Sequence, residues 1–243
     1  MGRRGQVTLF VIIAIIIVVA IALIAFLPSL GEKPATSPET MTSINSYVQE
    51  CVESTAGDGI YLLGMQGGYT ILPEKYFKTN FSIAYGYYEG SEWFPTLSKM
   101  TDQLDIYIEL MLPKCPDWGK WPDWTISPAD VKATSAAGAE SVQVKVSWPI
   151  TLKKGATTLK LEEFSAEIPV RLRMIHNISE GIISHEISSP DTIDLSYLID
   201  SGTKYNLKIN PVFYNSTIVY SITDPASTID NQPYVFMFAN KFT

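Results

Sequence analysis

The stretch SVQVKVSW, residues 141–148, alternates polar and apolar side chains at every position. Alternation with a period of two is typical of a β-strand that buries one of its faces. The residues KKGA, at 153–156, then predict a tight turn, and residues 157–164 provide a strand that returns beside the first. This region therefore predicts an antiparallel hairpin with one buried face.

Apolar residues at helical spacing flank the hairpin on both sides, and further short strands are indicated by aromatic and β-branched residues. The predicted helices cover residues 39–56 with a continuation at 59–63, a segment from Pro95 to Pro113, residues 168–187, and one or two turns at 193–198. Further strands are predicted at residues 69–72, 81–88, 205–212, 217–222 and 234–238. Helices in one block and hairpin-linked strands in another favour an α+β domain with an antiparallel sheet.

A long apolar run precedes this domain. From Leu9 to Leu27 the sequence has nineteen residues without a charge, a glycine or a proline. A helix of that length spans about 29 Å, close to the ~30 Å hydrocarbon core of a bilayer. Arg3 and Arg4 stand directly before the run, so the positive-inside bias predicts a cytoplasmic N-terminus and a main domain outside the cell. We therefore expect an α+β fold class in which an N-terminal transmembrane helix is followed by an extracytoplasmic domain of helices packed on an antiparallel sheet.

These features predict an order of segments along the chain. The expected segments are a basic cytoplasmic tip at 1–5, a transmembrane or filament-stem helix at 6–28, a linker at 29–38, and an extracytoplasmic domain at 39–243, either whole or as lobes 39–125 and 126–243. Three interpretations of the apolar run stay open. It is a signal peptide cut after Ala20-Ile21-Ala22, a plain membrane anchor, or the stem of a filament subunit.

Residues 4–8, RGQVT, followed by the Ile/Val-rich run, resemble the processing region of archaeal type IV pilin-like proteins. The resemblance is confined to this N-terminal segment. It implies that a dedicated peptidase cuts between Gly5 and Gln6 and that the apolar segment packs as a helix at the centre of a filament. The family usually carries Glu at the fifth mature position, where this chain has Phe10. The resemblance thus also fits a membrane-tethered relative or a minor subunit.

Composition argues against several classes of function. The formal net charge of −7 disfavours binding to nucleic acid, because phosphate contacts need clustered Lys and Arg. The sequence has no nucleophile elbow, no Gly-rich phosphate loop and no H-E-x-x-H motif. His176 and His185 lie on opposite sides of one predicted helix, so they cannot share a ligand. We expect no catalytic residue, no metal and no cofactor, and hence no enzyme.

The two cysteines, Cys51 and Cys115, fit an oxidising compartment. A bridge between them would close a long loop in the unfolded chain. The resulting loss of chain entropy would stabilise the folded state by about 4 kcal/mol. Two separate buried thiols are the alternative.

The residues CPDWGKWPDW, at 115–124, combine three tryptophans at intervals of three with aspartates and prolines. The indoles of Trp118, Trp121 and Trp124 beside carboxylates are the kind of surface that stacks on sugars or anchors a protein partner. The alternatives are that the rings cover the disulfide and complete a core, or that they contact lipid headgroups. Exposed rings favour recognition, and buried rings favour a structural role.

Sequons at Asn80 and Asn215 lie near predicted strand edges and are expected glycosylation sites, whereas the sequon at Asn177 lies within a predicted helix. Together these patterns predict a membrane-anchored, single-pass, extracytoplasmic structural or interaction protein of the cell surface, held by membrane lipid through residues 9–27. A pilin-like filament subunit or an adhesin, binding copies of itself or an envelope partner, fits this description. The alternative is an anchored recognition module that binds a glycan or a peptide through the tryptophan-rich residues.

Overall fold

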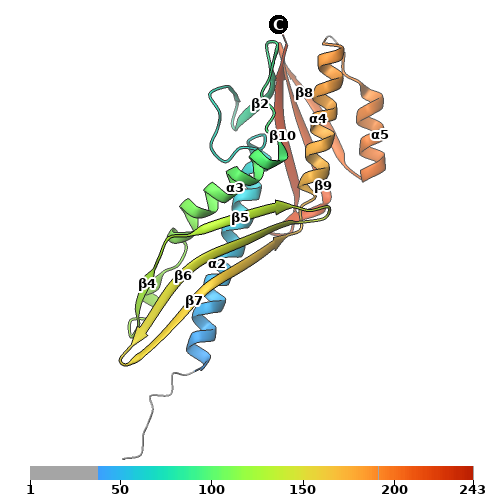
Figure 1. The fold of residues 1–243 in the computed structure, drawn as a ribbon. Helices are drawn as coiled ribbons and strands as arrows, with labels where there is room; N and C mark the ends of the chain where they lie inside the picture. Colours follow the sequence, from blue (N-terminus) through green and yellow to red (C-terminus); the bar gives the residue numbers. More distant parts are fainter. Residues whose placement is uncertain (1–37, 191, 243) are drawn as a thin grey trace, which may run out of the picture. The chain divides into compact units, whose positions relative to one another are not determined.

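The computed structural model describes residues 38–242 except residue 191 (Figure 1). The chain divides between Thr42 and Ser43, and both sheets lie on the Ser43 side of that division. The helices are α2 (Pro38–Met65), α3 (Leu97–Met111), α4 (Leu172–Ser188) and α5 (Leu195–Tyr205), with 3₁₀ turns η2 (Leu112–Lys114) and η3 (Trp118–Lys120). The strands are β1 (Tyr76–Lys78), β2 (Ser82–Tyr88), β3 (Ser91–Glu92), β4 (Thr125–Pro128), β5 (Lys132–Ala137), β6 (Val142–Lys154), β7 (Thr157–Ile168), β8 (Lys208–Tyr214), β9 (Thr217–Ile229) and β10 (Gln232–Lys241).

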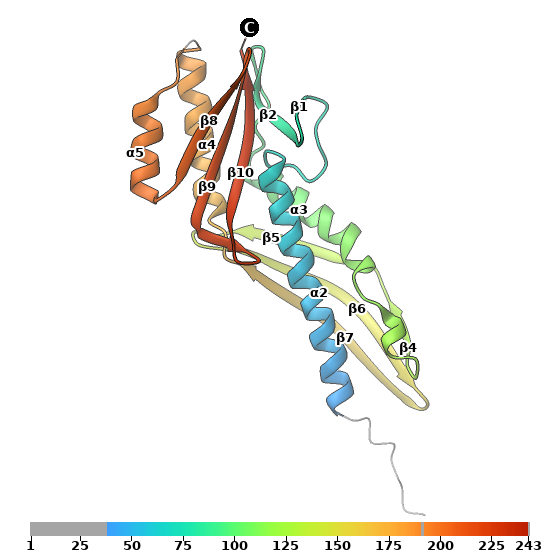
Figure 2. The ribbon, with the colours of Figure 1, turned by 180° about the vertical axis from the view of Figure 1, so that it is seen from behind.

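The first sheet is antiparallel and is built around β6. β7 pairs with the whole of β6 on one side, while β5 and β4 pair with its first and second halves on the other. The predicted hairpin is confirmed, because the apolar positions of the alternating stretch, from Val142 to Trp148, are all buried. Figures 1 and 2 show α2 running along one face of this sheet. The face that alternation predicted to be buried is therefore the one that packs on α2.

The second sheet has the strand order β1-β2-β10-β9-β8, with β3 attached to β2. Its pairs are antiparallel except that β2 and β10 run parallel. α4 covers one face, where Tyr220, Phe236 and Phe238 are buried, and α5 lies next to α4 (Figure 1). The expectation of one antiparallel sheet is thus wrong, since residues 43–242 hold two sheets and the second is mixed.

α2 contacts both sheets and α3. It buries an apolar stripe whose members are Ile44, Val48, Cys51, Val52, Ala56, Ile60 and Leu63. The Gln49 amide donates a hydrogen bond to the Ser165 carbonyl of β7, at 2.6 Å. At the other end of the helix, the Tyr234 hydroxyl of β10 donates to the Ile60 carbonyl, at 3.3 Å. One helix therefore forms the shared core of the two sheets.

Two glycines permit close packing around α2. A side chain at Gly59 would meet Leu104 and Tyr107 of α3 at 2.6 and 2.8 Å. A side chain at Gly64 would meet the Val235 carbonyl of β10 at 2.3 Å. The helix ends at Met65, where the glycine-rich residues predicted a break. It is continuous up to that point because its apolar stripe is continuous.

Several local predictions differ from the structure. Residues 69–72 form no strand, because the Thr70 and Ile71 amides donate to the Gln103 side-chain oxygen instead of to a neighbouring strand. The predicted turns at 193–198 belong to α5, which is capped by the left-handed Asn206, so β8 begins only at Lys208. The short strands β4 and β5 were not predicted.

The expected fold class also included a transmembrane helix, and that part is corrected. Among the helices within residues 38–242, none is both long enough and apolar enough to cross a membrane. The longest, α2, carries Glu50, Glu53 and Asp58 between its buried positions. The apolar run 9–27, on which the expectation rested, lies outside the described residues, as does the processing site at Gly5 and Gln6. The fold shown by the structure is α+β, with helices packed on two sheets.

We predict that Gly64→Ala destabilises the protein while Gly57→Ala, on the same helix, does not. The methyl group at 64 would collide with a β10 carbonyl, and overpacking of this kind costs about 1–3 kcal/mol. At Gly57 the nearest atom would be Ile229 Cγ2 at 3.7 Å, so alanine fits and gains about 0.5–1 kcal/mol of helix propensity. Urea unfolding of the full chain in mild detergent measures both. Equal stability of the two variants would contradict the close approach of α2 to β10.

Candidate functional site

The segment from Cys115 to Trp124, which we call the tryptophan loop, connects α3 to β4. It begins after the η2 turn and contains η3, whose start is capped by the Asp117 carboxylate accepting a hydrogen bond from the Gly119 amide at 3.1 Å. Pro116 and Pro122 restrict the backbone on either side of η3. Contacts within the loop therefore restrict its backbone, in addition to the contacts that it makes with other elements.

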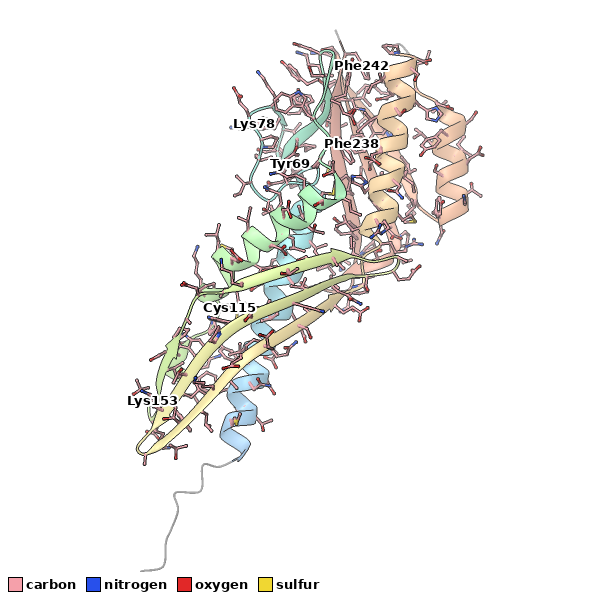
Figure 3. The ribbon with its side chains drawn as sticks, in the orientation of Figure 1. Tyr69, Lys78, Cys115, Lys153, Phe238 and Phe242 are labelled. Carbon is pink, nitrogen blue, oxygen red and sulfur yellow. A yellow bond between two sulfur atoms is a disulfide. The ribbon has the colours of Figure 1, made fainter. Side chains whose placement is uncertain are left out.

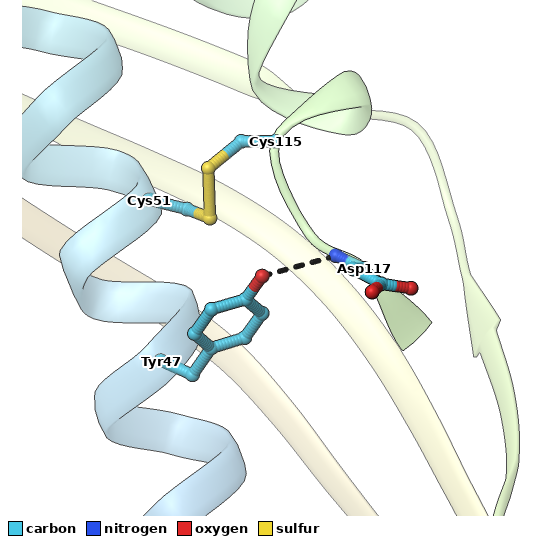
Figure 4. Close-up of a disulfide and its surroundings, with 4 residues drawn as sticks. All are labelled: Tyr47, Cys51, Cys115 and Asp117. Carbon is cyan, nitrogen blue, oxygen red and sulfur yellow. Dashed lines mark hydrogen bonds between the residues drawn. A yellow bond between two sulfur atoms is a disulfide. The ribbon is translucent and has the colours of Figure 1, made fainter. Parts of the chain in front are cut away.

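A disulfide joins the tryptophan loop to α2, which confirms the bridge between Cys51 and Cys115 (Figure 4). The two Cα atoms lie 5.8 Å apart, within the normal range for a disulfide. One helical turn before Cys51, the Tyr47 hydroxyl accepts a hydrogen bond from the Asp117 amide at 3.1 Å (Figure 4). A covalent bond and a hydrogen bond therefore fix the start of the loop on successive turns of α2.

Each tryptophan of the loop has a partner outside the loop, and the partners of Trp118 and Trp121 lie inward. The Trp118 ring lies 6.1 Å from the fully buried Trp148 ring of β6, and the Trp121 ring lies 5.2 Å from Tyr47. The Lys154 ammonium is 5.9 Å from the Trp124 ring centre. All three loop indoles are half-buried. The rings therefore close the core between α2 and β6 on one side and present part of their surface to solvent on the other, so neither of the two simple expectations describes them.

Lysines gather around these rings. The Lys120 ammonium lies 4.1 Å from the centre of the Tyr47 ring, and the Lys154 ammonium pairs with the Asp123 carboxylate at 3.1 Å. The hydrogen bond from the Asp117 amide, together with Lys120, lowers the pKa of the Tyr47 hydroxyl. These are the contacts of a cationic and aromatic surface.

The expected glycosylation sites lie in turns. Asn80 is exposed in the turn between β1 and β2, and Asn215 is exposed in the two-residue turn between β8 and β9, where its φ of 53° is left-handed. The Phe242 amide donates to the Ser216 carbonyl in that turn, at 3.3 Å. Figure 3 shows Phe242 at one end of the second sheet and Lys153 at the opposite end of the first sheet. The Asn215 sequon therefore lies far from the tryptophan loop.

The two histidines serve separate contacts on α4. His176 is buried, and its Nε2 lies 3.0 Å from the Pro95 carbonyl. His185 stacks on Tyr197 of α5, with its Nδ1 2.9 Å from the Asp194 carboxylate. As expected from their spacing, they do not share a site.

Sequence reasoning missed a buried acid beneath α4. Glu186 is only 2% exposed, and its carboxylate accepts hydrogen bonds from the Tyr220 hydroxyl and from the Asn240 amide. Burial raises the pKa of Glu186, and the two hydrogen bonds only partly oppose that effect. The Asn240 side-chain oxygen is buried without a partner among the described residues. Nothing in the helical spacing distinguishes Glu186 from a solvent-facing glutamate, because its partners lie on β9 and β10.

A second missed feature is an apolar groove of about 610 Å³ between the α4–α5 connection and β8. Its apolar lining includes Ile193, Leu195, Pro211, Phe213, Ile218 and Phe242. Leu195 and Phe213 are 60% and 64% exposed. The alternation of Ile209, Pro211 and Phe213 along β8 was the available signal, but the sequence alone does not show that α5 leaves part of this edge exposed.

Comparison of the chain with models of protein families, with curated proteins and with solved structures found no match.

We predict that the Cys51→Ser/Cys115→Ser double variant loses about 4 kcal/mol of unfolding free energy in the chain-entropy treatment. The disulfide closes a loop with a sequence separation of 64, so its loss frees the unfolded chain. Urea unfolding of oxidised and reduced protein measures the change. The double variant should match the reduced wild type and should not respond to reductant. A double variant as stable as the oxidised wild type would contradict a structural role for this bond.

Proposed function

We propose that this chain is a non-enzymatic structural or interaction protein of the cell surface, located outside the cytoplasm and attached to membrane lipid through residues 9–27. The observation that carries the proposal is the disulfide between Cys51 and Cys115. Disulfides form and persist in oxidising compartments and are rare in the cytosol. The bond sits at the start of the tryptophan loop, where it clamps that loop to α2.

The exposed sequons support the same location. Asn80 and Asn215 stand in turns, where an oligosaccharide can be attached without unfolding a strand. The proposal therefore includes glycosylation at these two positions. Asn177 is exposed on α4, but its hydroxyl partner in the sequon, Ser179, is fully buried and donates to the Ile175 carbonyl.

Exposed apolar surface supports an interaction role. The groove beside β8 exposes Leu195 and Phe213, and apolar patches of this kind mark contact sites for other molecules. Copies of this chain or another envelope protein are the proposed occupants of such contacts. Under the pilin-like resemblance, the mature chain begins at Gln6.

A second candidate function is recognition of a glycan or a peptide by the tryptophan loop. The half-exposure of Trp118, Trp121 and Trp124 favours it. Because Trp148 and Tyr47 occupy the inward sides of Trp118 and Trp121, a ligand would contact only the outer parts of those rings.

Surface labelling of intact cells tests the proposal. We expect a membrane-impermeant amine reagent to label the exposed lysines, including Lys78 and Lys153, as fully in intact cells as in lysed cells. A cytosolic protein serves as the control and should be labelled only after lysis. Labelling that requires lysis would contradict the extracytoplasmic location.

The same purified protein tests the start of the mature chain. Terminal sequencing should find Gln6 first, and Gly5→Val should block the cut while the matched variant Gly2→Val leaves it unchanged. An intact Met1 or Gly2 in the wild type would remove the pilin-like start but not the extracytoplasmic location.

A further inference from the structure

We propose that the tryptophan loop and the neighbouring turn between β6 and β7 form a contact surface for anionic lipid headgroups. This inference rests on the proposed attachment through residues 9–27. It adds a second, peripheral contact made by the folded unit itself.

The proposed contact surface carries a local excess of positive charge. The tryptophan loop with Lys114, and the end of β6 with Lys153 and Lys154, together hold four lysines and two aspartates. One aspartate, Asp123, is already paired with Lys154. The whole chain has a net charge of −7, so this end is basic in an otherwise acidic protein. Juxtamembrane lysines are attracted to anionic leaflets, and the attraction is local because salt screens it within about 10 Å.

The side chains between the lysines are aromatic and apolar. Trp and Tyr are enriched where proteins meet the headgroup region, because their rings are apolar and their edges can form hydrogen bonds. Trp121 and Trp124 are half-buried against Tyr47 and Lys154, which leaves part of each indole outside the core. Directly before the loop, Leu110 and Met111 at the end of α3 are 57% and 37% exposed. Apolar and basic side chains therefore occur together at this end.

Few residues separate this surface from the proposed lipid-attached segment. α2 enters the unit at Ser43, and Tyr47, one turn later, contacts the tryptophan loop. Residues 28–37, which separate the apolar run from α2, reach at most about 35 Å when fully extended. The loop is therefore fixed to the part of α2 that is nearest in the chain to the proposed lipid-attached segment.

The exposed turn with Asn215 provides an independent check on this orientation. It contacts Phe242, at the end of the second sheet opposite to Lys153 (Figure 3). A glycan on Asn215 would thus extend away from the bilayer and would not cover the tryptophan loop.

Quenching of tryptophan fluorescence by brominated lipid tests the contact. The full chain is reconstituted into phosphatidylcholine vesicles with and without phosphatidylglycerol, using acyl chains brominated close to the headgroup. We expect quenching in the anionic vesicles and its loss near 1 M salt, where the screening length falls to about 3 Å. Trp121→Phe and Trp124→Phe should each remove part of the quenched signal. Trp93→Phe, an equally half-buried indole outside the loop, should remove none of it.

A charge variant covers the case in which a tryptophan replacement disturbs folding. Lys153→Glu, at an exposed position at the end of β6, should lose most of the quenching, whereas Lys78→Glu, exposed on β1, should retain it. Equal quenching in both variants, or none in the wild type, overturns the headgroup contact. Recognition of a soluble ligand would then be the remaining role for the tryptophan loop.

Flotation of the same vesicles separates this inference from the proposed function. Protein that floats with the vesicles but shows no quenching keeps the attachment and refutes the contact. Protein that does not float refutes the attachment through residues 9–27, and the contact that depends on it.

Discussion

The packing of α2 against two sheets is the constraint on which the rest of the structure depends. The helix buries one continuous apolar stripe; it contacts the first sheet at Gln49, whose amide donates to Ser165 of β7, and reaches β10 near Gly64. α4 also contacts both sheets, since Arg173 donates to the Ala137 carbonyl of β5 and Glu186 accepts from Tyr220 of β9, but its contact with the first sheet is made at the end of β5. A 28-residue helix is also long enough, at about 1.5 Å per residue, to reach from one sheet to the other.

The same helix fixes the tryptophan loop. Tyr47 and Cys51 lie one turn apart and hold successive parts of that loop, while Trp148 of β6 supports it from the sheet. The aromatic and basic surface is therefore a rigid part of the fold, fixed to the turns of α2 that carry Tyr47 and Cys51. The exposed sequon turn and the apolar groove beside β8 lie on the second sheet, so contacts with lipid and with other proteins would use different ends of the unit.

The sequence predicts those elements whose pattern is local. The alternation at 141–148 is enough to identify β6, and the helical spacing after Ile168 identifies α4. The parallel pairing of β2 with β10 could not be predicted, because the two strands come from distant parts of the chain and carry no shared local signal. Residues 69–72 have strand-like composition, but Gln103 provides their hydrogen bonds. For the candidate site, composition pointed to the tryptophans, whereas the role of Tyr47 depends on a contact 70 residues away.

Native-state hydrogen exchange on the full chain tests most directly whether α2 unites the two sheets. Val52 is fully buried on α2, and truncating a buried valine weakens the shared core. If the account is correct, Val52→Ala lowers the protection of the β6 and β10 amides by the same amount, because both sheets open together. Loss of protection in β6 alone, with β10 unchanged, would show that the sheets are stabilised independently and would contradict the account.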